Sequence, residues 1–220
     1  MASNHAFNGV EIGWLIHDCF KIKKDNLTVY IDPYELKSNQ EKADLILITH
    51  DHYDHCDPKS VENIRKEGTK IITNKAASLK IGGSEVISAG ETKEFKGMKI
   101  EAVPAYNTKE ERLEYHPKED GCLGFVLKLG EVKIYHSGDS DLIDEMDKIK
   151  ADVALLPVSG TYVMNPKEAV EAVKKIKPKL AIPMHIEAGV VGTREDAEEF
   201  KSLVPENIEV KILEPKIKPK

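Results

Sequence analysis

The hydrophobic pattern of the first third of the chain consists of short β-rich runs separated by turn residues. This pattern predicts strands over Val10–His17, Cys19–Lys23 and Leu27–Ile31. Residues 24–26, Lys-Asp-Asn, have the composition of a hairpin turn between the last two of these strands. Leu45–Thr49 is a continuous apolar run, which is typical of a strand that is covered on both faces.

The remainder of the chain mixes strand patterns with helical ones around a polar loop at Thr108–Gly121. Further strands are predicted over 70–73, 85–87, 98–103, 123–129, 132–136, 153–157, 180–184 and 208–213. Helices are predicted over Pro58–Lys66 after the N-cap Asp57 and over Pro166–Ile176 after the N-cap Asn165, with proline at the first helical position in both. A third helix is predicted over Thr193–Leu203, where Thr193 and Asp196 resemble a capping box. Strand-rich blocks with interspersed helices predict an α+β sandwich with the helices on its outer faces.

Composition and charge narrow the class of protein. A length of 220 residues, with 40% hydrophobic and 32% charged residues, predicts a single globular domain over residues 1–220. The net charge of −6 argues against nucleic acid as a partner, and the lysine-rich end at 216–220 is expected to be a solvated tail. No apolar run approaches the roughly 20 residues of a membrane helix, and the first ten residues lack the pattern of a signal peptide. The three cysteines are too few for a disulfide framework, so a reducing, cytoplasmic setting is expected.

The segment with the clearest chemistry follows the apolar run that ends at Thr49. His50, His52, Asp54 and His55 place three of the eight histidines and one carboxylate within six positions. Imidazole nitrogen and carboxylate oxygen are ligands that suit zinc, iron or manganese. In extended backbone, residues two apart point the same way, so His50 and His52 can share one ion. Asp54 and His55 follow the start of a turn and can face a second ion.

One cluster cannot fill two coordination spheres, so further ligands are expected downstream. Asp139 follows the predicted strand 132–136, and its two carboxylate oxygens could bridge two cations. His185 follows the predicted strand 180–184, and His116 lies in the polar loop. Taken alone, each of the three residues is more often an ordinary solvated or packed side chain, and a ligand role is favoured only because the sites that the cluster begins need further ligands.

These motifs resemble those of the metallo-β-lactamase superfamily. Residues 50–55 match its H-x-H-x-D-H signature, Tyr135–Asp139 is similar to its motif with a bridging aspartate, and Pro183–His185 is similar to its closing histidine motif. Within the superfamily, residues 14–17, 31–34 and 164–166 are similar to uncharacterised zinc hydrolases and ascorbate-6-phosphate lactonase-like proteins. The resemblance runs from about residue 10 to about residue 213 and implies a four-layer αββα sandwich with the metals at one edge.

The resemblance also implies a ligand set of histidines and aspartates: His50 and His52 on the first ion, Asp54, His55 and His185 on the second, and Asp139 bridging both. The chain departs from the family where many relatives have another histidine, because Asn107 follows the run Val103–Tyr106. Either His116 supplies this ligand, which is the favoured interpretation, or Asn107 and water complete a weaker site. His17 and His136 are candidates for supporting or substrate-contacting roles, as is Asp32, whose alternative role is that of a simple turn residue.

The expected function is that of a hydrolase with two divalent ions, zinc in first place and manganese or iron as alternatives. A hydroxide that bridges the ions would attack a small intracellular ester, lactone or phosphoester, and Asp54 would orient it. Two alternatives stay open, namely an iron-dependent oxidoreductase or dioxygenase on the same fold and a metal-binding module with weakened catalysis. The expected partner is a small-molecule substrate, with no nucleic acid and no membrane, and the oligomeric state stays open.

Overall fold

The structure is a computed structural model that describes residues 3–217. These residues form two compact units, one made of 3–88 with 213–217 and the other of 89–212. Each unit contains one seven-stranded mixed sheet. The expectation of a single domain stays a prediction. No helix among the described residues has the length and apolar character needed to cross a membrane.

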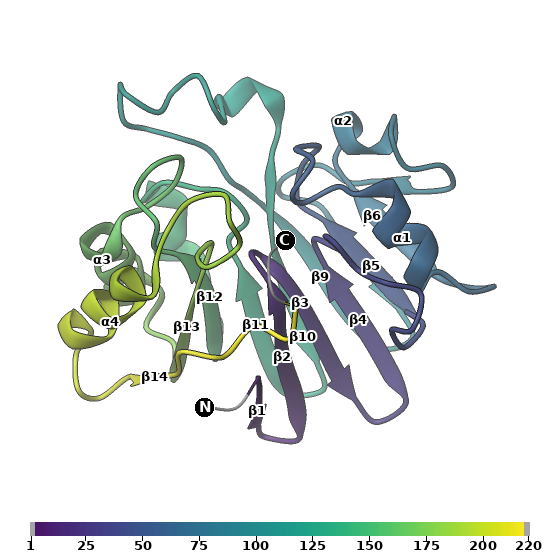
Figure 1. Ribbon diagram of the computed structural model, residues 1–220, viewed down its shortest axis with the longest axis horizontal. Helices are drawn as coiled ribbons and strands as arrows, with labels where there is room; N and C mark the ends of the chain where they lie inside the picture. Colours follow the sequence, from purple (N-terminus) through teal and green to yellow (C-terminus); the bar gives the residue numbers. More distant parts are fainter. Residues whose placement is uncertain (1–2, 218–220) are drawn as a thin grey trace. The chain divides into compact units, whose positions relative to one another are not determined.

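The sheet of the first unit runs in sequence order from β1 to β7 (Figure 1). Its strands are β1 (Asn4–Phe7), β2 (Val10–Ile16), β3 (Cys19–Lys24), β4 (Leu27–Ile31), β5 (Leu45–Ile48), β6 (Lys70–Thr73) and β7 (Glu85–Val86). The first four strands pair antiparallel, and β4 through β7 pair parallel. All four residues of β5 are buried, as the continuous apolar run predicts.

The sheet of the second unit has the order β14-β13-β12-β11-β10-β9-β8. Its strands are β8 (Thr92–Phe95), β9 (Met98–Pro104), β10 (Leu123–Leu129), β11 (Val132–His136), β12 (Val153–Pro157), β13 (Leu180–Met184) and β14 (Glu209–Val210). Strands β8 to β11 pair antiparallel, whereas β11 to β14 pair parallel. The second unit therefore repeats the strand plan of the first, four antiparallel strands followed by parallel ones.

Two helices belong to each unit, and two short 3-10 helices belong to the second. In the first unit they are α1 (Pro58–Ile64) and α2 (Lys75–Ser78), and in the second they are α3 (Pro166–Ile176), α4 (Arg194–Leu203), η1 (Lys118–Asp120) and η2 (Asp144–Lys148). Helices α3 and α4 pack against each other and against β12 and β13 (Figure 1). The buried face of α3 carries apolar side chains such as Val170 and Val173, which explains why the helix packs there.

The predicted helix starts agree with the structure. Asp57 accepts a hydrogen bond from Lys59 N at 3.0 Å, and Asn165 accepts one from Glu168 N at 2.9 Å. Asp196 accepts a hydrogen bond from the backbone N–H of Thr193 at 2.7 Å. Helix α1 ends two residues earlier than predicted because Arg65 has an extended backbone conformation.

Several elements differ from the sequence-based expectation. Strands β1 and β8 and helix α2 are additional, and the last strand covers only Glu209–Val210 instead of 208–213. After it, the chain returns to the first unit, where the N–H groups of Lys216 and Ile217 donate to the carbonyls of Trp14 and Leu15 at 3.3 and 2.9 Å. The expected solvated tail is therefore wrong for these two residues, and residues 218–220 lie outside the described part.

The capping box at the start of α3 leads to a stability prediction. Replacing Asn165 with alanine removes the acceptor for Glu168 N, and we expect the free energy of unfolding to fall by about 1 kcal/mol. Urea unfolding followed by circular dichroism measures this change. Lys167→Ala, at an exposed position of the same helix, is the control, and an equal effect of both variants would contradict the role of the cap.

Candidate metal centre

The carboxyl ends of the parallel strands carry most of the predicted site residues. In the first unit, Asp32 follows β4, and Thr49 and His50 follow β5. In the second unit, Asp139 lies shortly after β11, and His185 follows β13 directly. Because adjacent parallel strands end at the same sheet edge, side chains from loops far apart in sequence meet there within each unit.

Asp32 is a fully buried carboxylate that organises the histidine segment of the first unit. Its oxygens accept hydrogen bonds from the backbone N–H of Thr49 at 2.8 Å and from the Thr49 hydroxyl at 2.7 Å. The Nδ1 atom of His55 lies 2.9 Å from the same carboxylate. Of the two roles weighed for Asp32, this geometry favours the support of a histidine over a simple turn.

The same network fixes the orientation of His50. Its Nδ1 lies 2.9 Å from the Thr49 hydroxyl, which already donates its proton to Asp32. The Thr49 oxygen can therefore only accept from His50, so we assign the protons of His50 and His55 to Nδ1. In both rings Nε2 is then the unprotonated nitrogen, which is the form that binds a metal ion.

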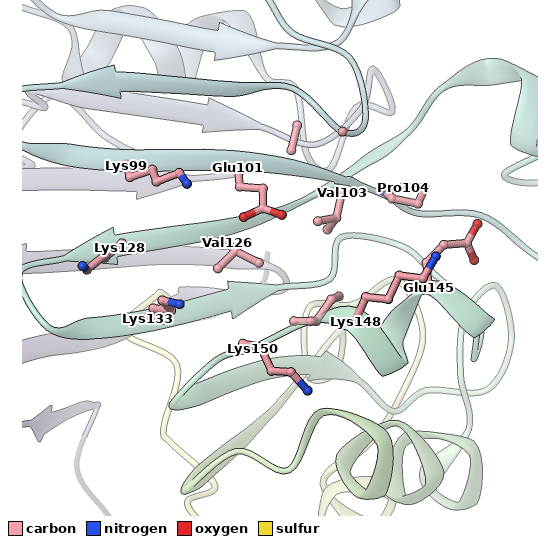
Figure 2. A pocket seen from close by; sticks show the side chains of 13 residues that line it. Lys99, Glu101, Val103, Pro104, Val126, Lys128, Lys133, Glu145, Lys148 and Lys150 are labelled. Atoms are coloured by element: carbon pink, nitrogen blue, oxygen red, sulfur yellow. The ribbon is translucent and has the colours of Figure 1, made fainter.

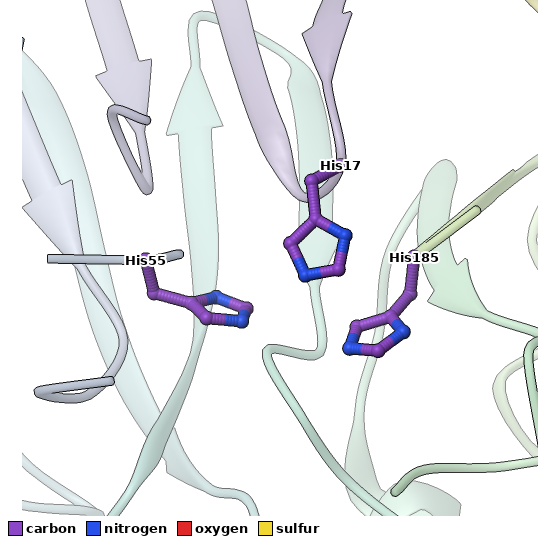
Figure 3. A group of neighbouring side chains, drawn as sticks. All are labelled: His17, His55 and His185. Carbon is purple, nitrogen blue, oxygen red and sulfur yellow. The ribbon is translucent and has the colours of Figure 1, made fainter. Parts of the chain in front are cut away.

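Three further side chains of the first unit, His17, His52 and Asp54, lie close to the rings of His50 and His55. The ring centroids of His50 lie 4.6 Å from His52 and 4.2 Å from His55, and those of His17 and His55 lie 5.3 Å apart. Figure 3 draws His17 and His55 with their rings edge to face, and the third residue it labels, His185, belongs to the second unit. Asp54 lies with Oδ2 at 3.2 Å from His17 Nε2 and Oδ1 at 3.9 Å from His55 Nε2.

His17 is part of this group although it lies 33 residues before His50. It occupies the turn between β2 and β3 with a φ of 52°, and its side chain is fully buried. The indole Nε1 of Trp14 donates to the His17 carbonyl at 2.6 Å and holds this turn. A left-handed conformation costs a residue such as histidine free energy, so the surrounding contacts must hold it.

In the second unit, the turn after β11 presents Asp139. Gly138 has a φ of 60°, and its N–H donates to His136 Nδ1 at 3.1 Å. The His136 ring thus accepts at Nδ1 and carries its proton on Nε2, opposite to His50 and His55. His136 therefore shapes the turn, and Asp139 is the residue whose carboxylate meets the histidines of this unit.

His116 meets Asp139 and is held by Asn107. The Asn107 Oδ1 atom accepts from His116 N and lies 3.0 Å from His116 Nδ1, and its Nδ2 donates to the Tyr162 carbonyl at 2.9 Å. The other ring nitrogen, Nε2, lies 3.4 Å from Asp139 Oδ2. This arrangement favours His116 as the ligand and Asn107 as its support, and the assignment stays a prediction.

His185 approaches the same oxygen. Its Nδ1 lies 2.8 Å from the Ser159 hydroxyl and its Nε2 lies 3.2 Å from Asp139 Oδ2, with a backbone φ of 62°. Gly192 lies against this loop, and a Cβ there would come within 2.5 Å of the His185 carbonyl and 2.6 Å of Ser159 Cβ. Sequence analysis did not single out Ser159 or Gly192.

The three groups of the second unit form a donor set that suits a cation. His116 Nδ1 can only donate to Asn107 Oδ1, so the Nε2 lone pair of His116 faces the Asp139 carboxylate, and His185 presents the same lone pair in the tautomer whose Nδ1 donates to Ser159. Lone pairs and negative charge repel one another in a buried site unless a positive charge lies between them. Two imidazole nitrogens and a carboxylate oxygen fit a divalent transition metal.

A buried arginine holds the loop that carries His116. Arg112 places Nη2 at 2.9 and 3.0 Å from the two Glu168 oxygens and Nε at 3.1 Å from Asp141 Oδ1. Asp141 also accepts the N–H groups of Thr108 and Lys109 at 2.7 and 3.1 Å. This network was not predicted. Its one signal in the sequence was a lone arginine among acidic residues, in a loop that was expected to be solvated.

Cys56 follows the histidine segment but has a different role. Only 2% of it is exposed, and burial raises the pKa of its thiol to about 11. The thiol is therefore protonated at neutral pH, and the residue packs as a small apolar side chain.

Comparison with known proteins identifies the family. The model of the beta-lactamase superfamily domain matches residues 11–185, which span parts of both units. A UPF0173 metal-dependent hydrolase of Methanopyrus kandleri is 35% identical over 231 residues, 94% of this chain and 97% of the relative. A crystal structure from Parabacteroides distasonis, described as that of a metal-dependent hydrolase, matches with a TM-score of 0.88 at 33% identity and covers 98% of this chain and 100% of that one.

The chain therefore belongs to the metallo-β-lactamase superfamily and, within it, to the UPF0173 metal-dependent hydrolases. The α+β class and the metallo-β-lactamase fold expected from the sequence are confirmed. The narrower likeness to ascorbate-6-phosphate lactonase-like proteins stays a prediction. A diiron β-hydroxylase from Streptomyces venezuelae shares the fold alone, with a TM-score of 0.72 at 16% identity over 97% of this chain and 53% of that one.

The role of Asp32 can be tested by Asp32→Asn, which replaces an acceptor oxygen with a donor beside Thr49 and His55. Because histidine ligands depend on such acceptors, we expect zinc affinity to fall about 10- to 100-fold. Competition with a chromogenic chelator measures this affinity. Asp44→Asn makes the same change at another buried carboxylate of the unit and should leave the affinity unaltered, so equal losses would contradict the specific role of Asp32.

The role of Asn107 can be tested with a pair of variants. Asn107→Ala removes the acceptor for His116 Nδ1, and we expect zinc affinity to fall about tenfold. Asn107→Asp keeps an acceptor oxygen and should retain more of the affinity than the alanine variant. The same chelator competition decides, and equal affinities of wild type and Asn107→Ala would contradict a supporting role.

Proposed function

We propose that this protein is a hydrolase with two divalent ions, bound by the histidines and aspartates described above. The proposed ligands are His50, His52 and His116 for the first ion, Asp54, His55 and His185 for the second, and Asp139 as the bridge. The set rests on the family to which the chain belongs and on the chemistry of the residues within each unit. Zinc is the proposed metal.

One observation carries this proposal. Four buried histidines each have Nδ1 directed at a side-chain oxygen of their own unit: His50 at Thr49, His55 at Asp32, His116 at Asn107 and His185 at Ser159. Histidines that bind metals commonly donate their other N–H to an oxygen, which fixes the tautomer and the ring plane. If these four histidines were only polar residues of the core, nothing would require the same ring nitrogen, Nδ1, of all four to be held by a side-chain oxygen.

Two divalent ions, when bound, supply a hydroxide at neutral pH and stabilise the oxyanion of an acyl or phosphoryl centre. The residues of this chain orient the reaction. Asp54 offers a carboxylate beside His17 and His55 that can accept a hydrogen bond from the attacking water. Asp32, Asn107 and Ser159 keep the rings in place, so the ligands need not rearrange during the reaction.

The proposed substrate is a small ester, lactone or phosphoester. Tyr53 lies within the signature segment and is 65% exposed, and its ring meets that of Tyr34 edge to face at 6.0 Å. Burial raises the pKa of Tyr34 to about 12, so its hydroxyl stays a neutral donor at neutral pH. An exposed tyrosine that packs against a half-buried one beside the candidate ligands suits contact with an organic substrate.

An iron-dependent oxidoreductase is the second candidate, and the shared fold of the diiron β-hydroxylase motivates it. Imidazole and carboxylate ligands suit iron as well as zinc. Elemental analysis of protein purified without added metal separates the two candidates. Two iron ions per chain together with an oxygen-dependent activity would overturn the hydrolase proposal.

The ligand role of His116 is tested by His116→Ala. Loss of one of the first ion's three histidines should reduce the metal content from two ions towards one per chain and lower turnover at least about 100-fold. Mass spectrometry for metals and an ester or phosphodiester assay provide the readouts. His5→Ala, in β1 and outside the proposed ligand set, is the control, and an unchanged ion count in His116→Ala would refute the assignment.

Turnover itself is tested with a panel of generic lactone, thioester and phosphodiester substrates before and after treatment with a chelator. We expect at least one class to be hydrolysed, activity to disappear on chelation, and zinc to restore it. If no class is turned over by a protein that contains two ions, a metal-binding module with weakened catalysis becomes the better description.

A further inference from the structure

The open face of the second sheet carries a row of lysines in register. Lys128 on β10 lies directly opposite Lys99 on β9 and directly opposite Lys133 on β11. Directly opposite residues on adjacent antiparallel strands have Cβ atoms about 4.5–5.5 Å apart, and like charges at these positions are destabilising. The sheet therefore keeps three positive charges side by side at a cost to its own stability.

No carboxylate among the described residues forms an ion pair with the ammonium groups of this lysine row. None of the three lysines forms an ion pair within 4.0 Å, although Glu94 lies opposite Lys99 on β8. Asp152 accepts the backbone N–H of Lys133 at 3.0 Å, but the ammonium group with which it forms an ion pair is that of Lys179, at 2.8 Å, and its electrostatic interaction with Lys133 acts at longer range. Other lysines of this unit do form ion pairs, such as Lys118 with Glu145 at 3.0 Å and Lys175 with Asp147 at 2.8 Å.

The lysine row borders a cavity of about 440 Å³ (Figure 2). Lys148, at the end of η2, and Lys150, shortly after it, add two further positive charges to its lining. Val103, Val126 and Ile149 provide an apolar surface between the charged groups. The cavity thus combines five ammonium groups with a nonpolar floor.

The charge balance of this cavity is opposite to that of the chain. Five lysines face two glutamates, Glu101 and Glu145, and Glu145 is engaged by Lys118 and the Tyr106 hydroxyl. The chain as a whole has a net charge of −6. None of the proposed metal ligands lines the cavity, so it is a separate feature of the second unit.

We propose that this cavity binds a small organic polyanion, a molecule with two or more phosphate or carboxylate groups and a nonpolar part. Lysine ammonium groups are compact point charges that bind phosphate, and the ligand would relieve their mutual repulsion. The volume lies in the range of small-molecule sites, and the valines and Ile149 would contact the nonpolar part. A nucleic-acid backbone is disfavoured because the acidic remainder of the surface would repel it.

Isothermal titration calorimetry on the metal-loaded protein tests this proposal with two probes, ADP and inorganic pyrophosphate. We expect both to bind and ADP to bind more tightly, since only ADP has a nonpolar part to place on Val126. The double variant Lys128→Gln/Lys133→Gln should weaken ADP binding at least about tenfold, because each charged hydrogen bond contributes about that factor. Lys201→Gln, an equal loss of charge on the exposed side of α4, should leave binding unchanged.

Thermal unfolding supplies the second readout. Without ligand, the double variant should melt at the same temperature as the wild type or higher, because the change removes repulsion between lysines, and ADP should raise the melting temperature of the wild type only. Binding that survives in the double variant but disappears in Asp139→Asn would place the probes at the proposed metal ions and overturn this proposal. The assignment to a small ligand would be overturned if a short DNA duplex bound more tightly than ADP and lost this binding in the same double variant. The absence of any binding would also overturn the proposal.

Discussion

The contact between Nδ1 of four buried histidines and a neighbouring side-chain oxygen is the constraint on which the candidate centre depends. An imidazole in a closed core could rotate and exchange its proton between two nitrogens, and either change would move the lone pair that a metal needs. Asp32, through Thr49 and directly at His55, removes this freedom for two rings at once. Asn107 and Ser159 act likewise on His116 and His185 in the other unit. The ligand geometry is thus fixed by side chains that would not themselves touch a metal.

These supporting side chains can act because of where the strands end. Within each unit, antiparallel strands pass into parallel ones, and the loops beyond the parallel strands hold Asp32, the histidine segment, Asp139, Ser159 and His185. Buried apolar strands such as β5 and β13 provide a rigid base for these loops. These loops contain backbone that is costly to form, since Asp32 and His185 have positive φ values, and so does His17 in the turn between β2 and β3. Such conformations persist only where the surrounding structure holds them, which accords with a preorganised site.

The outer face of the second sheet carries lysines that no carboxylate of the described residues pairs with, whereas the buried polar groups near the metal centre have partners within the fold. Strand β9 alternates buried and exposed residues, so one of its faces is left to solvent, and lysines from three strands line up on it. Arg112, by contrast, is almost completely buried, and two carboxylates neutralise it. The unit therefore contains cations of two kinds, one paired within the fold and one left for an external anion.

The elements and the chemistry that depend on neighbouring residues followed from local sequence patterns. The continuous run Leu45–Thr49 defined β5, the Asn165-Pro166 pair defined the start of α3, and the spacing of His50 to His55 defined a metal-binding segment. The roles of the other site residues became visible only in the tertiary structure, because their contacts join residues that are distant along the chain. Asn107 looked like a departure from the family pattern until its amide was found to hold His116, and His17 had no local signal that linked it to Asp54. Local patterns depend on hydrophobicity and backbone preference. The partner of a buried polar atom depends instead on how strands that are distant in sequence pack together.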